Sequence, residues 1–499
     1  VVLFSSCSSG NHSDKLVMPE RLNSREPVNI IFILSDDHSY NNMSFMGHEF
    51  LETPNMDAMA ANGVHMANAM VTTSLCSPSR ASILTGQYAF THGVINNSSP
   101  DPEGARFFSE YLQQAGYTTA FIGKWHMGAH TDEPRAGWDH WVSFQGQGRY
   151  DPKGRRLNIN GKHVDRKKYM TDELTDYAIE WLEAQKGSDA PFMLYLSHKA
   201  VHSNFEPAKR HRGRYTNVDI TWPETMNLTE EQSAGKPMWL LNQRNSWHGV
   251  DFPYHSDLDL EEWYKRYNET ILAVDESIGT VRDYLKENGM YDNTVIIYTS
   301  DNGFQFGEQG LIDKRVAYEA SIRVPLLLEA PELLKAGTTV DQVVANIDIA
   351  PTILELAGLK TPATMQGRSF LPLTLQEAGK WDREYLLYTY YWEESFPHTP
   401  TILALRGDRY KYIHYYGLWD THELYDLLED PKEKYNIIRR DEEAQAIAGR
   451  MRSKLFEMLK EEGGDYIPLR APGNSDPLKH GMRSSDGAES ADFPSYYFN

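Results

Sequence analysis

Short apolar runs rich in β-branched residues alternate with longer amphipathic stretches over the first 330 residues. The runs lie at residues 28–34, 118–122, 192–197, 294–299 and 325–329, and the stretches at 56–61, 107–115, 172–184 and 261–287. An uninterrupted apolar run of this length suits a strand that is buried on both faces, as in a parallel sheet. The alternation therefore predicts an α/β fold, with a central, mostly parallel sheet flanked by helices.

The pattern changes after residue 380. Short runs at 385–391, 401–406, 410–414 and 423–426 predict strands joined by turns, and a helix is expected at 442–461. We therefore expect a main domain over residues 27–380, followed by a smaller C-terminal domain and tail over 381–499. The smaller domain should combine a short antiparallel sheet with one helix.

The first nine residues run from apolar through small to Ser-rich, with Cys7 among them. This pattern resembles the end of a bacterial lipoprotein signal in which Cys7 carries the lipid. The alternative is a truncated ordinary signal peptide with an incidental cysteine. Both interpretations predict export to the periplasm or cell surface, with residues 1–26 as signal remnant and tether, and membrane contact only through the anchor.

The charge balance limits the partners of this chain. Forty-nine Lys and Arg stand against 70 Asp and Glu, so the formal net charge is −21. Such a surface repels nucleic acid, and no apolar run approaches the length of a membrane span. An anionic substrate would need cations that are concentrated in one pocket, where short-range contacts outweigh screened distant charge.

Cys76 lies in an unusual setting, Cys76-Ser77-Pro78-Ser79-Arg80. A single cysteine is more often a buried core residue, and that interpretation remains open here. However, Pro78 suits the first turn of a helix, which would put Cys76 at the helix N-terminus and Arg80 one turn along. The helix dipole and the guanidinium would both attract an anion. The residues therefore indicate a nucleophile that handles an anionic group.

Two acidic pairs each follow an apolar run directly. Asp36-Asp37 comes after the first run, and Asp301-Asn302 comes after residues 294–299. Either pair alone would usually be a turn or a helix cap. If both strands are parallel, however, their carboxyl ends meet at one edge of the sheet. Three carboxylates and an amide suit a hard divalent cation, Ca²⁺ before Mg²⁺.

Cys76-x-Pro78-x-Arg80 followed by Leu84-Thr85-Gly86 resembles the signature of the formylglycine-dependent sulfatases, within the alkaline-phosphatase-like superfamily. The resemblance extends from about residue 28 to 330 and is strongest to exported bacterial carbohydrate sulfatases. It implies that a dedicated maturation enzyme oxidises Cys76 to formylglycine (3-oxoalanine). It also implies that one Ca²⁺ is bound by Asp36, Asp37, Asp301, Asn302 and the modified Cys76.

Other residues match motifs of the same family, and the resemblance implies their roles. Lys124 and His126 stand in Gly-Lys-Trp-His, His202 in His-Lys-Ala-Val-His, where the family more often has Pro in place of Val, and Lys314 in Ile-Asp-Lys-Arg. His126 would serve the aldehyde, and His202 with Lys314 would protonate the departing oxygen. Arg80 and Lys124 would stabilise negative charge on the sulfate, and His198 is expected to be structural.

The substrate implied by the resemblance is a sulfated saccharide, derived from ulvan, carrageenan, a glycosaminoglycan or a mucin glycan. Gln147, Arg149, Arg315 and Tyr318 are predicted to reach the substrate, the alternative for each being an ordinary loop position. Two other functions remain open. One is a phosphatase or phosphodiesterase of the same superfamily, although such enzymes commonly have Asp-His where this chain has Asp301-Asn302. The other is a non-catalytic glycan-binding lipoprotein.

Overall fold

The computed structural model describes residues 18–20, 22, 27–102, 104–128, 131–246, 248–251, 259–377, 379, 381–394, 396–418 and 420–467. Cys7 and the end of the predicted C-terminal tail lie outside these ranges. The predicted lipid anchor therefore stays a prediction. Among the described residues, no helix combines the length and the apolar character needed to cross a membrane.

Within the described ranges, ten strands form one large sheet. They are β1 (Asn29–Ser35), β2 (Val64–Met70), β3 (Thr118–Lys124), β4 (His140–Phe144), β5 (Arg156–Ile159), β6 (Lys162–Asp165), β7 (Phe192–Ser197), β8 (Thr294–Ser300), β9 (Leu326–Glu329) and β10 (Thr338–Ala345). Their order across the sheet is β10-β2-β9-β8-β1-β7-β3-β4-β5-β6. Strands β8, β1, β7, β3 and β4 run parallel, whereas β9 and the β5–β6 hairpin are antiparallel to their neighbours. The predicted central, mostly parallel sheet is confirmed.

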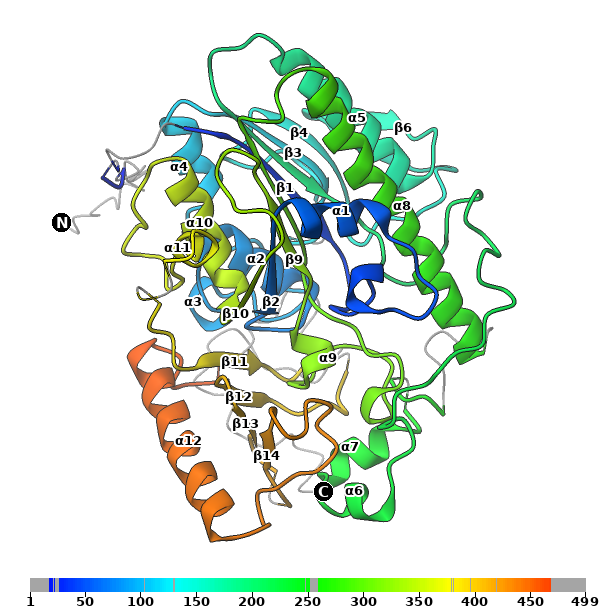
Figure 1. Ribbon diagram of the computed structural model, residues 1–499, viewed down its shortest axis with the longest axis vertical. Helices are drawn as coiled ribbons and strands as arrows, with labels where there is room; N and C mark the ends of the chain where they lie inside the picture. Colours follow the sequence, from blue (N-terminus) through cyan, green and yellow to red (C-terminus); the bar gives the residue numbers. More distant parts are fainter. Residues whose placement is uncertain are drawn as a thin grey trace, which may run out of the picture.

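Helices cover both faces of this sheet (Figure 1). One face packs against α1 (Pro54–Asn62), α5 (Met170–Gln185) and α8 (Leu260–Glu287), and the other against α2 (Cys76–Thr85), α4 (Phe108–Gln114) and α10 (Ile349–Leu356). Alternate residues of β1 point into the two cores, Ile31 and Ile33 into the first and Phe32 into the second. The central strands are mainly apolar because both of their faces are buried.

Shorter helices complete the main domain and its junction with the smaller one. The α-helical segments are α3 (Ala89–His92), α6 (Glu230–Ala234), α7 (Met238–Gln243), α9 (Glu319–Ile322) and α11 (Leu371–Thr374). Single 3₁₀ turns occur at η1 (Ser44–Met46), η2 (Glu308–Gly310) and η3 (Asn346–Asp348). These segments contribute mainly to the loops that join the larger elements.

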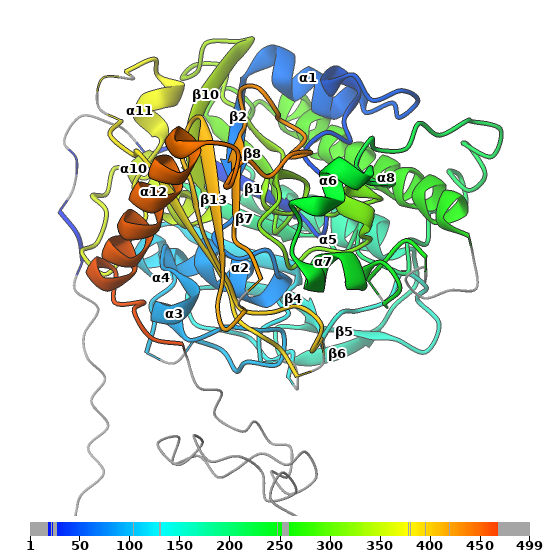
Figure 2. The ribbon, with the colours of Figure 1, turned by 90° about the horizontal axis from the view of Figure 1, so that it is seen from below.

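The C-terminal part forms a second, antiparallel sheet in sequential order: β11 (Leu386–Tyr390), β12 (Ile402–Arg406), β13 (Tyr410–Tyr415) and β14 (Glu423–Asp426). Helix α12 (Glu442–Glu461) lies along these strands, as Figure 1 and Figure 2 show. The side chain of Asp441 caps α12 by accepting a 2.7 Å hydrogen bond from the amide of Ala444. The small sheet packs tightly on the main domain, where Tyr388 Oη lies 2.7 Å from Ser74 Oγ.

Candidate active site

The two acidic pairs meet at the carboxyl edge of the large sheet. Asp36 and Asp37 follow β1, and Asp301 and Asn302 follow β8, which pairs in parallel with β1. The amide of Asp37 donates to Asp301 Oδ1 at 3.1 Å, and Asn302 Nδ2 donates to Asp37 Oδ1 at 2.6 Å. The strand-end rule therefore brings together two pairs of side chains that lie more than 260 residues apart in the sequence.

Cys76 is the first residue of α2, and its sulfur lies beside this acidic cluster. The distance from Sγ is 3.5 Å to Asp36 Oδ1 and 3.1 Å to Lys314 Nζ. Arg80 follows one turn along, and its Nε donates to Asp301 Oδ2 at 2.8 Å. The helix N-terminus, the guanidinium and the ammonium thus converge on position 76, as an anionic group would require.

Lys124 ends β3 and points into the same cluster. Its ammonium forms an ion pair with Asp36 and donates to the side-chain carbonyl of Gln147. Gly123, just before it, has a φ of 128°, and a Cβ at that position would lie 1.8 Å from the carbonyl oxygen of Ser197 on the next strand. Only glycine fits this close approach of β3 to β7.

Of the two predicted histidines of the site, His126 is buried and His202 is partly buried. His126 has a φ of 65°, and its Nδ1 lies 3.2 Å from Ser77 Oγ at the start of α2. His202 Nε2 lies 3.9 Å from Asp37 Oδ2. His198, by contrast, points to α8, where its Nε2 lies 3.0 Å from Ser277 Oγ. It therefore holds the helix against the sheet and takes no part in the cluster.

The acidic cluster fits a bound metal ion. One oxygen from each of Asp36, Asp37 and Asp301 lies within 4.8 Å of the others. Asp37 Oδ2 and Asn302 Oδ1 are buried and have no hydrogen-bond partner in the described part of the chain. Buried polar atoms are rarely left unbonded, so these two oxygens call for a partner. An all-oxygen set of this kind suits a hard divalent cation.

Burial and crowding separate the pKa values of the three carboxyls. Burial, with the charge of Asp36 added to it, raises the pKa of Asp301 to about 7. Burial also raises the pKa of Asp37. Burial opposes the ionisation of Asp36 as well, but Lys124 and Arg80 outweigh it and hold its pKa well below the usual range. A cation among the three would relieve this mutual repulsion.

The thiol and the imidazoles are kept uncharged. Burial raises the pKa of the Cys76 thiol to about 12, so the unmodified side chain is a thiol and a poor nucleophile at neutral pH. Burial and the charge of Lys124 lower the pKa of His126. The pKa of His202 is also lowered by burial. Both lowered pKa values favour the neutral form of the ring.

A pocket of about 410 Å³ opens above the cluster. Its lining includes His202 and Lys314, together with three residues predicted to contact substrate: Gln147, Arg149 and Arg315. The Arg315 guanidinium lies 3.7 Å from the centre of the Phe396 ring and is held by the carboxylate of Asp313. Four Lys and Arg residues line the pocket against one carboxylate among the described residues, that of Glu206, so the pocket suits an anionic group.

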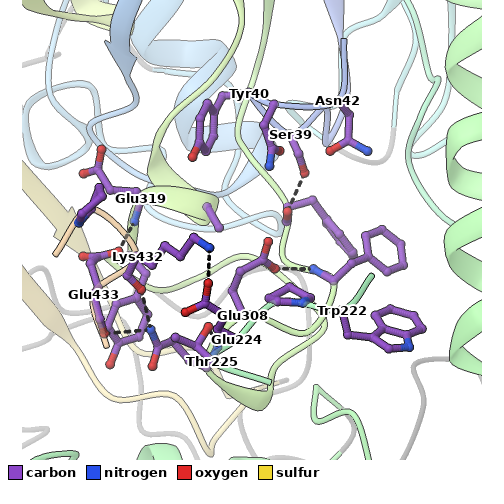
Figure 3. A pocket seen from close by; sticks show the side chains of 18 of the residues that line it. Ser39, Tyr40, Asn42, Trp222, Glu224, Thr225, Glu308, Glu319, Lys432 and Glu433 are labelled. Carbon is purple, nitrogen blue, oxygen red and sulfur yellow. Dashed lines mark hydrogen bonds and ion pairs between the residues drawn. The ribbon is translucent and has the colours of Figure 1, made fainter. Parts of the chain in front are cut away.

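Tyr318, the fourth predicted substrate residue, is not brought to this pocket. Its side chain is buried, and its hydroxyl donates to the carboxylate of Glu423 in the small domain at 2.8 Å. It borders a different pocket, shown in Figure 3, where Glu224, Glu308, Glu319 and Glu433 gather. Such an acidic lining would repel a sulfate ester.

Three further residues around the pocket were not predicted. Ser197 Oγ accepts a 2.7 Å hydrogen bond from Arg80. Ser197 ends β7, and its place at a strand end could have predicted that it lies near the site. Asn97 Oδ1 accepts from the amide of Ser77 at 3.0 Å. Lys199 lines the pocket, and burial lowers its pKa to about 7. The sequence carries no local signal for Asn97, which lies on an irregular loop.

Comparison with known protein families finds a match over most of the chain. Residues 28–359 match the sulfatase family, and residues 307–461 match the C-terminal region of N-sulphoglucosamine sulphohydrolase. The chain belongs to the sulfatase family. This sulfatase is 34% identical to an N-acetylglucosamine-6-O-sulfatase of Bacteroides thetaiotaomicron, over 90% of this chain and 88% of that one. It is 27% identical to an ulvan-active sulfatase of Formosa agariphila, over 91% and 85% of the two chains.

A solved structure supports the same assignment. The structure of BT4656 in complex with its substrate, D-glucosamine-2-N,6-O-disulfate, superposes with a TM-score of 0.80 and 33% identity. The match covers 89% of this chain and 99% of that one. The protein is therefore a sulfatase, a sulfuric ester hydrolase. Family membership favours this activity over the superfamily phosphatase and over a non-catalytic glycan-binding protein.

Proposed function

We propose that this sulfatase hydrolyses a sulfate ester on a carbohydrate, with formylglycine at position 76 as the nucleophile and one Ca²⁺ beside it. The observation that carries the proposal is the position of Cys76, at a helix N-terminus between an ammonium and a cluster of three carboxylates. A buried, neutral thiol is poorly suited to attack a sulfate ester. Its conversion by a maturation enzyme would remove that difficulty.

Each group would supply chemistry that the unmodified chain lacks. Hydrated formylglycine would offer one hydroxyl to attack sulfur and a second to release the sulfate afterwards. Ca²⁺, held by Asp36, Asp37, Asp301 and Asn302, would act as a Lewis acid toward a sulfate oxygen. Asp37 Oδ2 and Asn302 Oδ1, which have no hydrogen-bond partner among the described residues, support this ligand set.

The cations of the chain itself bind and orient the sulfate. Lys124 and Lys314 project into the cluster from two sides, and the buried Nη2 of Arg80 has no hydrogen-bond partner among the described residues. Preorganised donors of this kind favour the charge that develops on sulfate oxygens in the transition state. Desolvation strengthens each contact because the side chains are buried.

The histidines would move protons. A sulfate ester in the pocket adds negative charge beside His126 and His202, which raises the pKa of both rings from their lowered values. His202, at the mouth of the pocket, is positioned to protonate the departing sugar oxygen, with help from Lys314. His126, beside the start of α2, would accept a proton at residue 76. Asp37 would accept the proton of the attacking hydroxyl.

The relatives guide the choice of saccharide. One is an N-acetylglucosamine-6-O-sulfatase, another an ulvan-active sulfatase, and BT4656 binds a glucosamine disulfate. We therefore place 6-O-sulfated glucosamine derivatives first. Fragments of ulvan, carrageenan, glycosaminoglycans and mucin glycans come next.

A panel of defined sulfated sugars tests the proposal. The protein is produced together with a maturation enzyme, and free sulfate is measured with 6-O-sulfated N-acetylglucosamine, other monosaccharide sulfates and a phosphate monoester. We expect sulfate release that requires Ca²⁺ and is lost in Cys76→Ala. Phosphate release that is faster than sulfate release, with zinc as the activating ion, would instead support the phosphatase.

A further inference from the structure

A second hollow adjoins the catalytic pocket and is rich in arginine. It has a volume of about 560 Å³, and its walls include Arg149, Arg155, Arg156, Arg166 and His163. The two hollows share Gln147, Gly148 and Arg149, which lie between them. Gln147 itself accepts a hydrogen bond from Lys124 of the catalytic cluster. The arginine-rich hollow therefore lies directly beside the catalytic pocket.

One of the four arginines is structural. Arg166 pairs with Glu173 at 3.1 Å, and its guanidinium donates to the carbonyl oxygens of Arg149 at 2.6 Å and Tyr150 at 3.2 Å. These bonds satisfy Arg166 and fix the loop that carries Arg149. The charge of Arg166 is therefore neutralised by Glu173, and its role is to hold this wall of the hollow in place.

The other three arginines have no acidic partner in the part of the chain that the structure describes. Arg149, Arg155 and Arg156 are exposed, and within the described ranges no carboxylate oxygen lies within 4.0 Å of their guanidinium nitrogens. Asp165 stands opposite Arg156 across the β5–β6 hairpin without forming an ion pair. Most arginine side chains among the described residues form ion pairs, so three around a single hollow that form none there stand out.

Little negative charge faces this hollow. Asp132 is the one carboxylate in its lining among the described residues, and its Oδ1 is bonded to His163 Nε2 at 3.1 Å and to Asn158 Nδ2 at 3.3 Å. The chain as a whole carries a net charge of −21. A local concentration of positive charge on such a background attracts anions to this place rather than to the rest of the surface.

We propose that Arg155 and Arg156, with Arg149, bind a second anionic group of the substrate, beyond the sulfate that is cleaved. The inference rests on the proposed function and extends it: the preferred substrate is longer than a monosaccharide and carries another sulfate or carboxylate. Guanidinium groups suit both, because their planar donors form paired hydrogen bonds with oxyanions. Arg149, shared by the two hollows, would connect the two binding positions.

Binding to a catalytically silent protein tests this without depending on turnover. In the Cys76→Ala background, affinities are measured for three disaccharides that share one sulfated sugar. The second sugar carries no charge, a sulfate or a carboxylate. Arg155→Ala/Arg156→Ala is compared with Arg450→Ala, an exposed arginine on α12 at the far end of the molecule (Figure 1).

We expect the doubly anionic disaccharides to bind more tightly, and the double variant to lose about 10- to 100-fold in affinity for them alone. The tighter binder of these two disaccharides shows whether the second anionic group is a sulfate or a carboxylate. Arg450→Ala should leave all affinities unchanged, and unchanged melting temperatures would confirm that both variants fold. Equal affinity of the parent for all three disaccharides, or an equal loss for all three in the double variant, would overturn the inference. Failure of the mature enzyme to release sulfate from any of them would count against the proposed function instead.

Discussion

Removal of the proposed Ca²⁺ should destabilise the protein, and by more at pH 8 than at pH 6. The reason is that burial, with the charges of Asp36 and Asp37 added to it, raises the pKa of Asp301 to about 7. In the cation-free protein this raised pKa favours folding at low pH, and the contribution is lost as the pH rises through about 7. Ca²⁺ must displace that proton, so its apparent affinity should fall below neutral pH.

The expected size follows from linkage. Free Ca²⁺ at 100 times its dissociation constant stabilises the folded state by about 2.7 kcal/mol. One displaced proton weakens binding about tenfold between pH 8 and pH 6, which removes about 1.4 kcal/mol. With an unfolding entropy of about 2.1 cal/mol/K per residue, the Ca²⁺-dependent rise in melting temperature should be about 3 °C at pH 8 and half that at pH 6.

Differential scanning calorimetry in EDTA and in buffered Ca²⁺, at pH 6, 7 and 8, measures this directly. Asp301→Asn should weaken Ca²⁺ binding and flatten its pH dependence. Glu329→Gln alters a buried carboxylate that is paired with Arg282 away from the site. This variant should retain both Ca²⁺ binding and its pH dependence. A Ca²⁺ effect of equal size at all three pH values, or one that survives intact in Asp301→Asn, would refute the reasoning.

Three further predictions concern single residues. Lys314→Ala removes the ammonium 3.1 Å from the sulfur of Cys76, and kcat for sulfate release should fall about 10²- to 10³-fold. Tyr318→Phe removes a buried hydrogen bond to Glu423, so denaturant unfolding should show a loss of about 1–3 kcal/mol, with KM unchanged. Cys7→Ala should move the protein from the membrane to the soluble fraction of the native host, since we propose that Cys7 carries the lipid; equal fractionation would contradict this.

Much of the fold was predictable because the central strands are buried on both faces. Such strands have an unbroken apolar centre, as in β1 and β8, and stand out in the sequence. The strands that were missed are mixed in character. The hairpin strand β6 is exposed along its whole length, and β10 is buried mainly toward its end. Their polar residues give no clear period.

Some residues of the site could be predicted from the sequence pattern alone, and others only from the family resemblance. The meeting of Asp36-Asp37 with Asp301-Asn302 followed from strand ends alone. Lys314 and the histidines required a family resemblance, because loops without periodic patterns carry them to the cluster. Tyr318 lies only four residues from Lys314, but Arg315 has a φ of 79° and the chain turns there. The turn directs Tyr318 to the small domain, which sequence proximity could not indicate.

The chemical state of residue 76 is the most direct test of this account. Peptide mass spectrometry is applied to active protein from a host that contains a maturation enzyme. The account predicts that the peptide with position 76 is lighter by the difference between CH₂SH and CHO, and that this fraction tracks specific activity. An unmodified Cys76 in fully active protein would contradict it.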